Sequence, residues 1–232
     1  AYREEGYLPD AMLNFLASLG WNDGTEQEVF TRNELIEKFS LKRVQKSGAR
    51  FDEKRLLWLN GAHIRNIPVD KLYEYVSPWD DKPQKDGGQT GFWPESAYAP
   101  NITKEYRMKV LSLAQDRLKM FEDLRGFGYF FAEPEINMEL IDSNKQLKKL
   151  SDSERRELLE TARHELAKIT DWTPESIQTC LNKLLEITGQ KPGILFSLIR
   201  ITVTWAPFSP QLNDTLALIG REHTMARLQS SI

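Results

Sequence analysis

The amino-acid sequence predicts an all-α protein. Apolar residues recur at intervals of three and four over several stretches, Ser, Thr or Pro stands where such stretches begin, and Gly stands where they end. The chain has 232 residues, of which 40% are hydrophobic and 28% are charged, as in an ordinary globular protein with a real core. This length accommodates one large domain or two to three small ones.

The first helices are expected in a compact unit that ends around Ile67. Pro9 suits a first helical position, and Gly20 stops a run with helical spacing made by Leu8, Met12, Phe15, Leu16 and Leu19. A second helix is expected over residues 33–39. A third begins near Asp52 and runs toward Gly61, carrying Leu56, Leu57 and Leu59.

The middle of the chain combines a loop with one expected long helix. The segment DDKPQKDGGQTG (residues 80–91) is predicted to form an exposed loop; it lies among several prolines and glycines. Steps of 4, 3, 7 and 4 then connect Tyr106, Val110, Leu113, Met120 and Leu124, as one face of a helix would. Arg117 occupies the missing step of that face.

Start and stop signals are clear in the last third. Ser151 and Glu154 have the spacing of a capping box. Thr173 and Pro174 predict a cap and a first helical residue, and Gly189 predicts the end of that helix. Ser209 followed by Pro210 predicts a further helix start, with Gly220 as its stop.

Several functional classes lack their signatures. The single cysteine, Cys180, rules out an intramolecular disulfide framework, and no stretch approaches the ~20 apolar residues of a membrane span. No signal peptide or phosphate-binding glycine motif is present, and the three histidines are too dispersed for a zinc site. We therefore expect no catalytic residue, cofactor or metal in this chain. Its first residues, without an initiator methionine, suggest an excised fragment.

Charge is uneven along the chain. The formal net charge is -3, which does not by itself indicate a nucleic-acid binder. Residues 38–55 nevertheless hold seven basic residues (Lys38, Lys42, Arg43, Lys46, Arg50, Lys54 and Arg55) against two acids, Asp52 and Glu53. This surplus either forms a solvated face or supplies contacts to phosphates.

Three segments resemble bacterial-type glutamyl-tRNA synthetase. They are GYLPDAMLNFLASLGW (residues 6–21), FDEKRLLWLNGAHIR (51–65) and RITVTWAPFSPQLNDTLALIGREHTMARL (200–228). The resemblance runs from Tyr2 to Leu228 and matches the portion downstream of the catalytic domain. It implies a helical stem-contact unit at residues 1–67 and two helical anticodon-binding subdomains at 68–140 and 141–232.

The resemblance also implies a division of labour. The family's His-x-Gly-His and Lys-Met-Ser-Lys-Ser-like catalytic motifs are absent; His63, Ile64 and Arg65 begin like the first, but Asn66 does not continue it. The chain would select the tRNA for glutamate, while a catalytic domain of the same polypeptide would use ATP, glutamate and magnesium. A cytoplasmic monomer is expected. An all-helical protein-interaction scaffold derived from the same fold is the alternative.

Two arginines are candidate readers of the anticodon. Arg200 interrupts the apolar run LFSLIRITV and either lays its stem over the core or offers its planar fork to a base. The resemblance places it on the anticodon-binding surface. Arg117 either forms a structural ion pair or, as the resemblance implies, favours the first anticodon base of glutamate tRNA over that of glutamine tRNA.

The segment after Arg200 supplies further candidates. In the family, a Thr-Pro pair and a following Leu and Phe surround the last anticodon bases; here they are Ser209, Pro210, Leu212 and Asn213. Asn213 lacks the stacking ring that the family has, so Phe208 or Trp205 would have to provide it.

The amino-terminal unit supplies candidate contacts to the tRNA backbone. The resemblance and the basic surplus indicate Lys42, Arg43, Lys46 and Arg65. Trp58, in the LLWLNG match, is expected in the core rather than stacked on a base.

Overall fold

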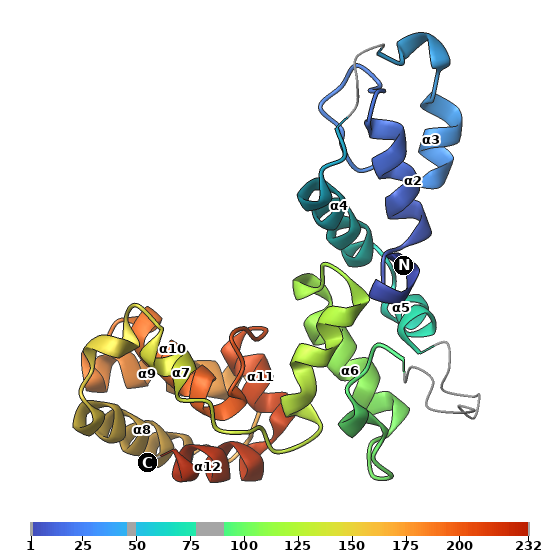
Figure 1. The fold of residues 1–232 in the computed structure, drawn as a ribbon. Helices are drawn as coiled ribbons and strands as arrows, with labels where there is room; N and C mark the ends of the chain where they lie inside the picture. The colour runs from blue at the N-terminus through green and yellow to red at the C-terminus, as the bar shows by residue number, and fades with distance from the viewer. Residues whose placement is uncertain (1, 46–49, 78–90, 232) are drawn as a thin grey trace. The chain divides into compact units, whose positions relative to one another are not determined.

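The described part of the protein is helical. The computed structural model describes residues 2–45, 50–77 and 91–231, and within these ranges it contains helices and loops but no strand. This confirms the all-α prediction. The chain forms two compact units (Figure 1): unit 1 comprises Ala1–Glu95 and Ala114–Arg125, and unit 2 comprises Ser96–Leu113 and Gly126–Ile232. This division describes compactness only, so the three functional parts remain a prediction.

Unit 1 is built on two packed helices, α2 and α4, with α3 alongside α2. Phe15 of α2 meets Leu56 and Leu59 of α4 in one core cluster, and Leu35 of α3 joins Trp21 in another. These helices confirm the three expected near the amino terminus. The elements of the unit are α1 (Tyr2–Glu5), α2 (Pro9–Ser18), α3 (Arg32–Lys38), η1 (Leu41–Arg43), α4 (Glu53–Arg65), α5 (Val69–Val76) and η3 (Gln115–Arg117).

Local capping explains where α3 and α4 begin. The Thr31 side chain accepts the Glu34 amide at the start of α3, and the Glu34 carboxylate accepts the Thr31 amide. The two bonds form a capping box. Asp52 accepts the amides of Lys54 and Arg55 at the start of α4. These bonds satisfy amides that the first helical turn leaves without intrahelical partners.

Asn60, a fully buried polar residue on α4, connects distant parts of unit 1. Its side-chain oxygen accepts the Leu8 amide at 2.8 Å, and its amide group donates to the Lys119 carbonyl at 2.6 Å. Gly6 lies beside Phe121 so closely that a Cβ on Gly6 would come within 2.5 Å of it, and its φ is +91°. Only glycine fits there.

The single long helix expected across residues 106–124 is wrong. α6 (Lys104–Ala114) ends at Ala114, η3 follows, and Leu118 is extended. The Gln115 side chain donates to the Ile64 and Ile67 carbonyls at 2.8 and 2.7 Å. Asp123 then accepts the Lys119 and Met120 amides. These bonds hold residues 115–123 in a bent path, because they satisfy groups that a continuous helix would use otherwise.

Unit 2 packs its long helices around α10, which contacts α8, α9 and α12 (Figure 1). Ser151 and Glu154 form the predicted capping box at α8. Thr173 caps α9, Pro174 is its first residue, and Gly189 ends it in the left-handed conformation, all as predicted. The elements are α6, η4 (Phe121–Phe130, which crosses the division), α7 (Glu139–Asp142), η5 (Leu147–Lys149), α8 (Asp152–Leu166), α9 (Pro174–Thr188), α10 (Pro192–Thr204), α11 (Leu212–Ile219) and α12 (Arg221–Ser230). A short η2 (Glu95–Tyr98) precedes them.

The predicted start of α11 at Ser209 and Pro210 is displaced. The helix begins at Leu212 and Gln211 is its N-cap, with no side-chain capping bond. Ser209 is buried and its hydroxyl donates to the Pro210 carbonyl at 2.9 Å, so it is engaged within the preceding loop. Gly220 ends the helix as predicted.

Trp205 ends α10 in an unusual conformation. Its φ is +44°, and among the described residues it is the one non-glycine with positive φ. The left-handed conformation costs an L-residue about 1–2 kcal/mol, so this position ordinarily favours glycine or asparagine.

Arg227 of α12 is a buried residue that forms hydrogen bonds with several segments of unit 2. It is only 6% exposed. Its guanidinium donates to the carbonyls of Tyr129, Val203 and Ala132 at 3.0, 3.1 and 3.2 Å and to a Glu133 oxygen at 2.9 Å. His223 lies 2.7 Å from the other Glu133 oxygen.

Candidate nucleic-acid interface

Arg200 lies near the carboxyl end of α10, at the edge of the core. Leu195, Leu198 and Ile199 are fully buried, whereas Arg200 is partly exposed. Its guanidinium donates to the Pro207 carbonyl at 3.1 Å. One of its five donors therefore holds the following loop, and the fork lies beside that loop rather than flat along the core.

The segment 209–213 combines buried and accessible residues. Ser209 and Pro210 are buried, while Leu212 and Asn213 are partly exposed. The Asn213 amide reaches the Pro174 carbonyl at 3.5 Å, a weak contact. Leu212 and Asn213 open α11, whose first amides have no side-chain cap and are therefore donors that a base edge could meet. Asp214 in the same turn makes a phosphate an unfavourable partner.

A hollow of about 280 Å³ lies at the carboxyl end of α10, a few residues before this segment in the chain. Its lining includes Thr204, Trp205 and Ala206 from the end of α10, and Gly126, Gly128 and Tyr129 from η4. We call it the Trp205 hollow. Phe208 lies close by in the chain, with its ring against Gly126 and edge-on to Phe127 at 5.7 Å.

Arg117 belongs to the other compact unit. It is exposed at the end of η3, and within the described ranges no ion pair involves it. The Gln115 bonds to Ile64 and Ile67 place η3 at the carboxyl end of α4, the same end that carries Arg65. The structure thus brings Arg117 near Arg65 in unit 1, while the Arg200 segment lies in unit 2.

The candidate backbone contacts occupy two places in unit 1. Lys42 and Arg43 are exposed in η1, and Arg43 donates to the Asp23 carbonyl. Gln45, next in the chain, donates to the Gly20 carbonyl just beyond α2. Arg65 stands at the carboxyl end of α4, whose 13 residues span about 18 Å at the usual rise per residue. Lys46 lies outside the described residues.

The basic surplus of residues 38–55 is partly neutralised. Lys38 pairs with Asp23 at 3.3 Å, and Arg55 stands 3.9 Å from Glu28. Lys42, Arg50 and Lys54 are exposed, and within the described part of the chain none of them forms an ion pair. Part of this stretch therefore retains positive charge for a partner.

Trp58 is not the core residue that the sequence indicates. Its exposed fraction is 47%, whereas the neighbouring Leu59 is fully buried. Leu56 and Leu59 face α2 in the core, and a helical step of two residues from Leu56 turns Trp58 to the other side.

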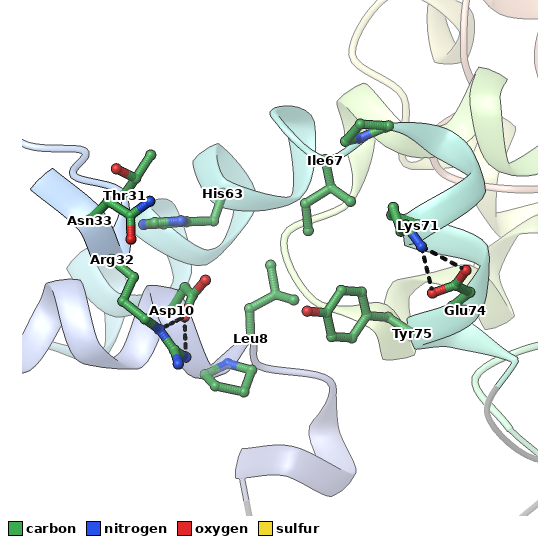
Figure 2. Close-up of a pocket in the computed structure, with 12 residues that line it drawn as sticks. Leu8, Asp10, Thr31, Arg32, Asn33, His63, Ile67, Lys71, Glu74 and Tyr75 are labelled. Atoms are coloured by element: carbon green, nitrogen blue, oxygen red, sulfur yellow. Dashed lines mark hydrogen bonds and ion pairs between the residues drawn. The ribbon is translucent and has the colours of Figure 1, made fainter.

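A cavity in unit 1 has a different character. Figure 2 shows its lining, and its volume is about 870 Å³. Arg32 is paired with Asp10 at 2.5 Å, and Lys71 with Glu74 at 3.1 Å, so its charges are mutually satisfied. Burial lowers the pKa of His63 below its ordinary value, although Asp10 opposes that shift. The cavity therefore offers no net positive charge to a nucleic acid.

Metal binding and membrane insertion find no support in the described residues. Among them, no three His, Cys, Asp or Glu side chains gather where they could hold a metal ion. None of the helices in the described ranges has both the length and the apolar character needed to cross a bilayer.

The sequence did not reveal the groups that shape the Trp205 hollow. Tyr129 is 4% exposed, and its hydroxyl has no hydrogen-bond partner in the described part of the chain. Burial raises the pKa of Tyr129 strongly, with an opposing effect from Arg200. Arg227 and Glu133 also lie far apart in sequence, so no local spacing could have indicated their pairing.

Two parts of the chain match known families. Residues 71–232 match the family described as "Anticodon binding domain". Residues 1–58 match "tRNA synthetases class I (E and Q), catalytic domain". The catalytic-domain family thus reaches into the first helices, although the two catalytic motifs are absent from the chain.

Individual relatives agree with these families. The chain is 34% identical over 232 residues to the glutamate–tRNA ligase of Chloroflexus aurantiacus, covering 100% of this chain and 44% of that protein. It is 32% identical over 231 residues to glutamate–tRNA ligase 1 of Alkalilimnicola ehrlichii, covering 100% of this chain and 45% of that protein.

A solved structure agrees in fold. A glutamate tRNA ligase from Elizabethkingia meningosepticum superimposes with a TM-score of 0.70 at 24% identity, covering 100% of this chain and 42% of that one. The chain thus spans less than half the length of the curated relatives it matches. The anticodon binding domain family matches residues 71–232, which are well over half of the residues of this chain. The chain therefore belongs to that family.

Proposed function

We propose that this chain is the tRNA-selecting portion of a glutamate–tRNA ligase. The observation that carries the proposal is the Arg200 segment: an arginine fork, an uncapped helix start and a hollow with an aromatic wall all belong to unit 2, and residues 200–213 contribute to each of them. Unstacked bases are recognised by such edge donors and rings. The match of residues 71–232 to anticodon binding domains supports the assignment.

The whole protein would carry out glutamylation in the cytoplasm. Its relatives are glutamate–tRNA ligases, so ATP, glutamate and magnesium are the expected reactants and cofactor of a catalytic domain in the same polypeptide. The residues of this chain would orient the tRNA, and they would not form the adenylate. We expect the chain to be a monomer.

The two units of the protein would contact different parts of the tRNA. Lys42, Arg43, Lys46 and Arg65 in unit 1 would contact phosphates. Arg117 would read the first anticodon base, and Arg200 with Ser209, Pro210, Leu212 and Asn213 would surround the later ones. Because Ser209 and Pro210 are buried, their role is to shape the loop that presents Leu212 and Asn213.

The alternative is an all-helical protein-interaction scaffold. Exposed apolar side chains on unit 1, such as Leu16, Ile36 and Leu41, give it some support. They also fit a surface covered by the rest of a longer polypeptide, because residues 1–58 match only part of a catalytic-domain family. The unpaired basic residues favour the RNA-binding proposal.

Binding of unmodified glutamate tRNA tests the proposal. Four phosphate contacts through Lys42, Arg43, Lys46 and Arg65 give a slope of about -3.6 in log K against log salt, so affinity falls about 150-fold from 50 to 200 mM salt. A change of the anticodon alone should weaken binding further.

A matched pair of variants serves as the control. Changing Lys42, Arg43 and Arg65 to Gln should flatten the salt dependence, whereas changing the exposed Lys145, Lys148 and Lys149 to Gln should leave it intact. Binding that ignores both salt and anticodon would indicate a scaffold.

A further inference from the structure

Trp205 stands at a position whose backbone conformation favours glycine over a large side chain. The residue ends α10 with φ +44° and ψ +36°, a conformation that glycine adopts at no steric cost. Strained residues of this kind persist where the surroundings or the function require them, and they concentrate at binding sites.

The Trp205 ring makes no compensating aromatic contact. The residue is partly exposed, and among the described residues no other ring packs against it. Phe208 differs, because its ring lies against Gly126 and meets Phe127 edge-on. Of the two rings that could replace the one missing at Asn213, Phe208 is therefore packed on another ring, whereas Trp205 is not.

The hollow beside Trp205 has the size and chemistry for a flat, uncharged group. Small residues, including Gly126, Gly128 and Ala206, leave a space of about 280 Å³. Glu133 also borders it, but its carboxylate is already bound by Arg227 and His223. No free positive charge lines the hollow, so a phosphate is a poor occupant.

A second observation also indicates a ligand. Tyr129 lines the hollow, and its buried hydroxyl has no hydrogen-bond partner in the described part of the chain. Buried polar groups without partners are rare, and each calls for an explanation such as strain, a functional role, or a water or ion that is absent from the free protein. The Thr204 hydroxyl donates to the Arg200 carbonyl at 2.8 Å, and Thr204 lines the hollow, so the hollow lies one helical turn from the candidate RNA-reading arginine.

We propose that the Trp205 hollow receives one unstacked base of the bound tRNA, which stacks on the Trp205 indole. The inference rests on the proposed function and adds a specificity-determining contact to it. Every base has a π-face, and stacking on an aromatic side chain contributes to affinity without requiring a charge. The strained backbone at Trp205 is then explained, because it holds the ring at the hollow.

Replacing Trp205 with glycine separates the two possible roles of the ring. Trp205→Gly should leave the melting temperature of the 232-residue chain unchanged or raise it, because glycine relieves the positive φ. Its affinity for glutamate tRNA should fall about 5- to 150-fold, the usual range for one base stacked on an aromatic side chain. The salt slope should stay that of the wild type, because no phosphate contact is lost. Trp205→Phe should recover most of the affinity.

Abasic tRNAs identify the base. Glutamate tRNAs with one anticodon-loop base removed at a time are titrated against the wild type and Trp205→Gly. One abasic site should weaken binding to the wild type and leave binding to Trp205→Gly unchanged, the coupling expected of two groups in contact.

Each other result overturns the inference. Equal tRNA affinity of Trp205→Gly and wild type removes the stacking role but leaves the proposed function standing. A large fall in melting temperature, with affinity retained by the folded protein, makes Trp205 a packing residue. A loss of affinity in Phe208→Ala alone assigns the base to Phe208. If wild type itself fails to bind glutamate tRNA in a salt-dependent way, the proposed function fails, and this inference fails with it.

Discussion

Replacing Arg227 with methionine should destabilise unit 2 more than any surface substitution. Methionine keeps the length of the buried stem but removes every donor. The carbonyls of Tyr129, Val203 and Ala132 then lose their partner inside the protein. Each buried polar group left without a partner costs about 1–3 kcal/mol.

The loss of stability in Arg227→Met depends on which of the former partners of Arg227 can be hydrated in the variant. Glu133 is 59% exposed, so its carboxylate returns to water, and its ion pair contributes less than about 1 kcal/mol. The three carbonyls dominate, at about 1 kcal/mol each, and the total is about 3–4 kcal/mol. For a chain of this size the melting temperature should fall by about 10 °C.

Urea unfolding followed by circular dichroism, with thermal melts alongside, measures this loss. Arg156→Met is the matched control, because Arg156 is exposed on α8 without an ion pair in the described residues; it should change stability by less than about 0.5 kcal/mol. Glu133→Gln should cost less than Arg227→Met. A loss below about 1 kcal/mol for Arg227→Met, or one matched by Glu133→Gln, would refute the reasoning.

Four further outcomes are expected. Arg200→Ala should weaken binding to glutamate tRNA by about 1–3 kcal/mol. If binding is unchanged and the melting temperature falls, Arg200 has only a structural role, through its bond to the Pro207 carbonyl. Arg117→Gln should reduce discrimination between glutamate and glutamine tRNAs more than overall affinity, because glutamine both donates and accepts; equal losses for both tRNAs would point to a phosphate contact. Hydrogen bonds from Lys168 and Lys183 lower the pKa of Glu165 to about 2. The Glu165 carboxylate therefore contributes fully to stability above about pH 4.5, and this contribution is lost as the pH falls toward 2. Glu165→Gln should make the free energy of unfolding less dependent on pH in this range. The chain alone should show no glutamate-dependent exchange between ATP and pyrophosphate, and measurable exchange would contradict the absence of catalytic motifs.

The sequence predicts best what local chemistry determines. The capping box at Ser151 and the start of α9 at Thr173 are confirmed, because each depends on residues within one helical turn. The ends at Gly189 and Gly220 follow from the ease with which glycine adopts positive φ. These signals need no knowledge of the rest of the fold.

Where distant groups compete with local preference, the sequence fails. No proline or glycine breaks the stretch after Ala114, yet bonds from Gln115 to carbonyls about 50 residues earlier in the chain bend it. Trp58 has the composition of a core residue, but the register of α4 against α2 turns it outward. Of the candidate site, the sequence supplied the residue types near Arg200. It could not supply the Trp205 hollow, which η4 and α10 form together.

The interrupted make-up of unit 1 has a consequence for synthesis of the protein. Residues 114–125 return to this unit after the chain has contributed residues 96–113 to unit 2. The bonds from Asn60 to Lys119 and from Gln115 to the Ile64 and Ile67 carbonyls form only once Lys119 and Gln115 exist. The protein is synthesised from its amino terminus. About 60 further residues must therefore be added after Asn60 of α4 before its bond to Lys119 can form. Any truncation that stops before Ala114 leaves unit 1 permanently at that stage.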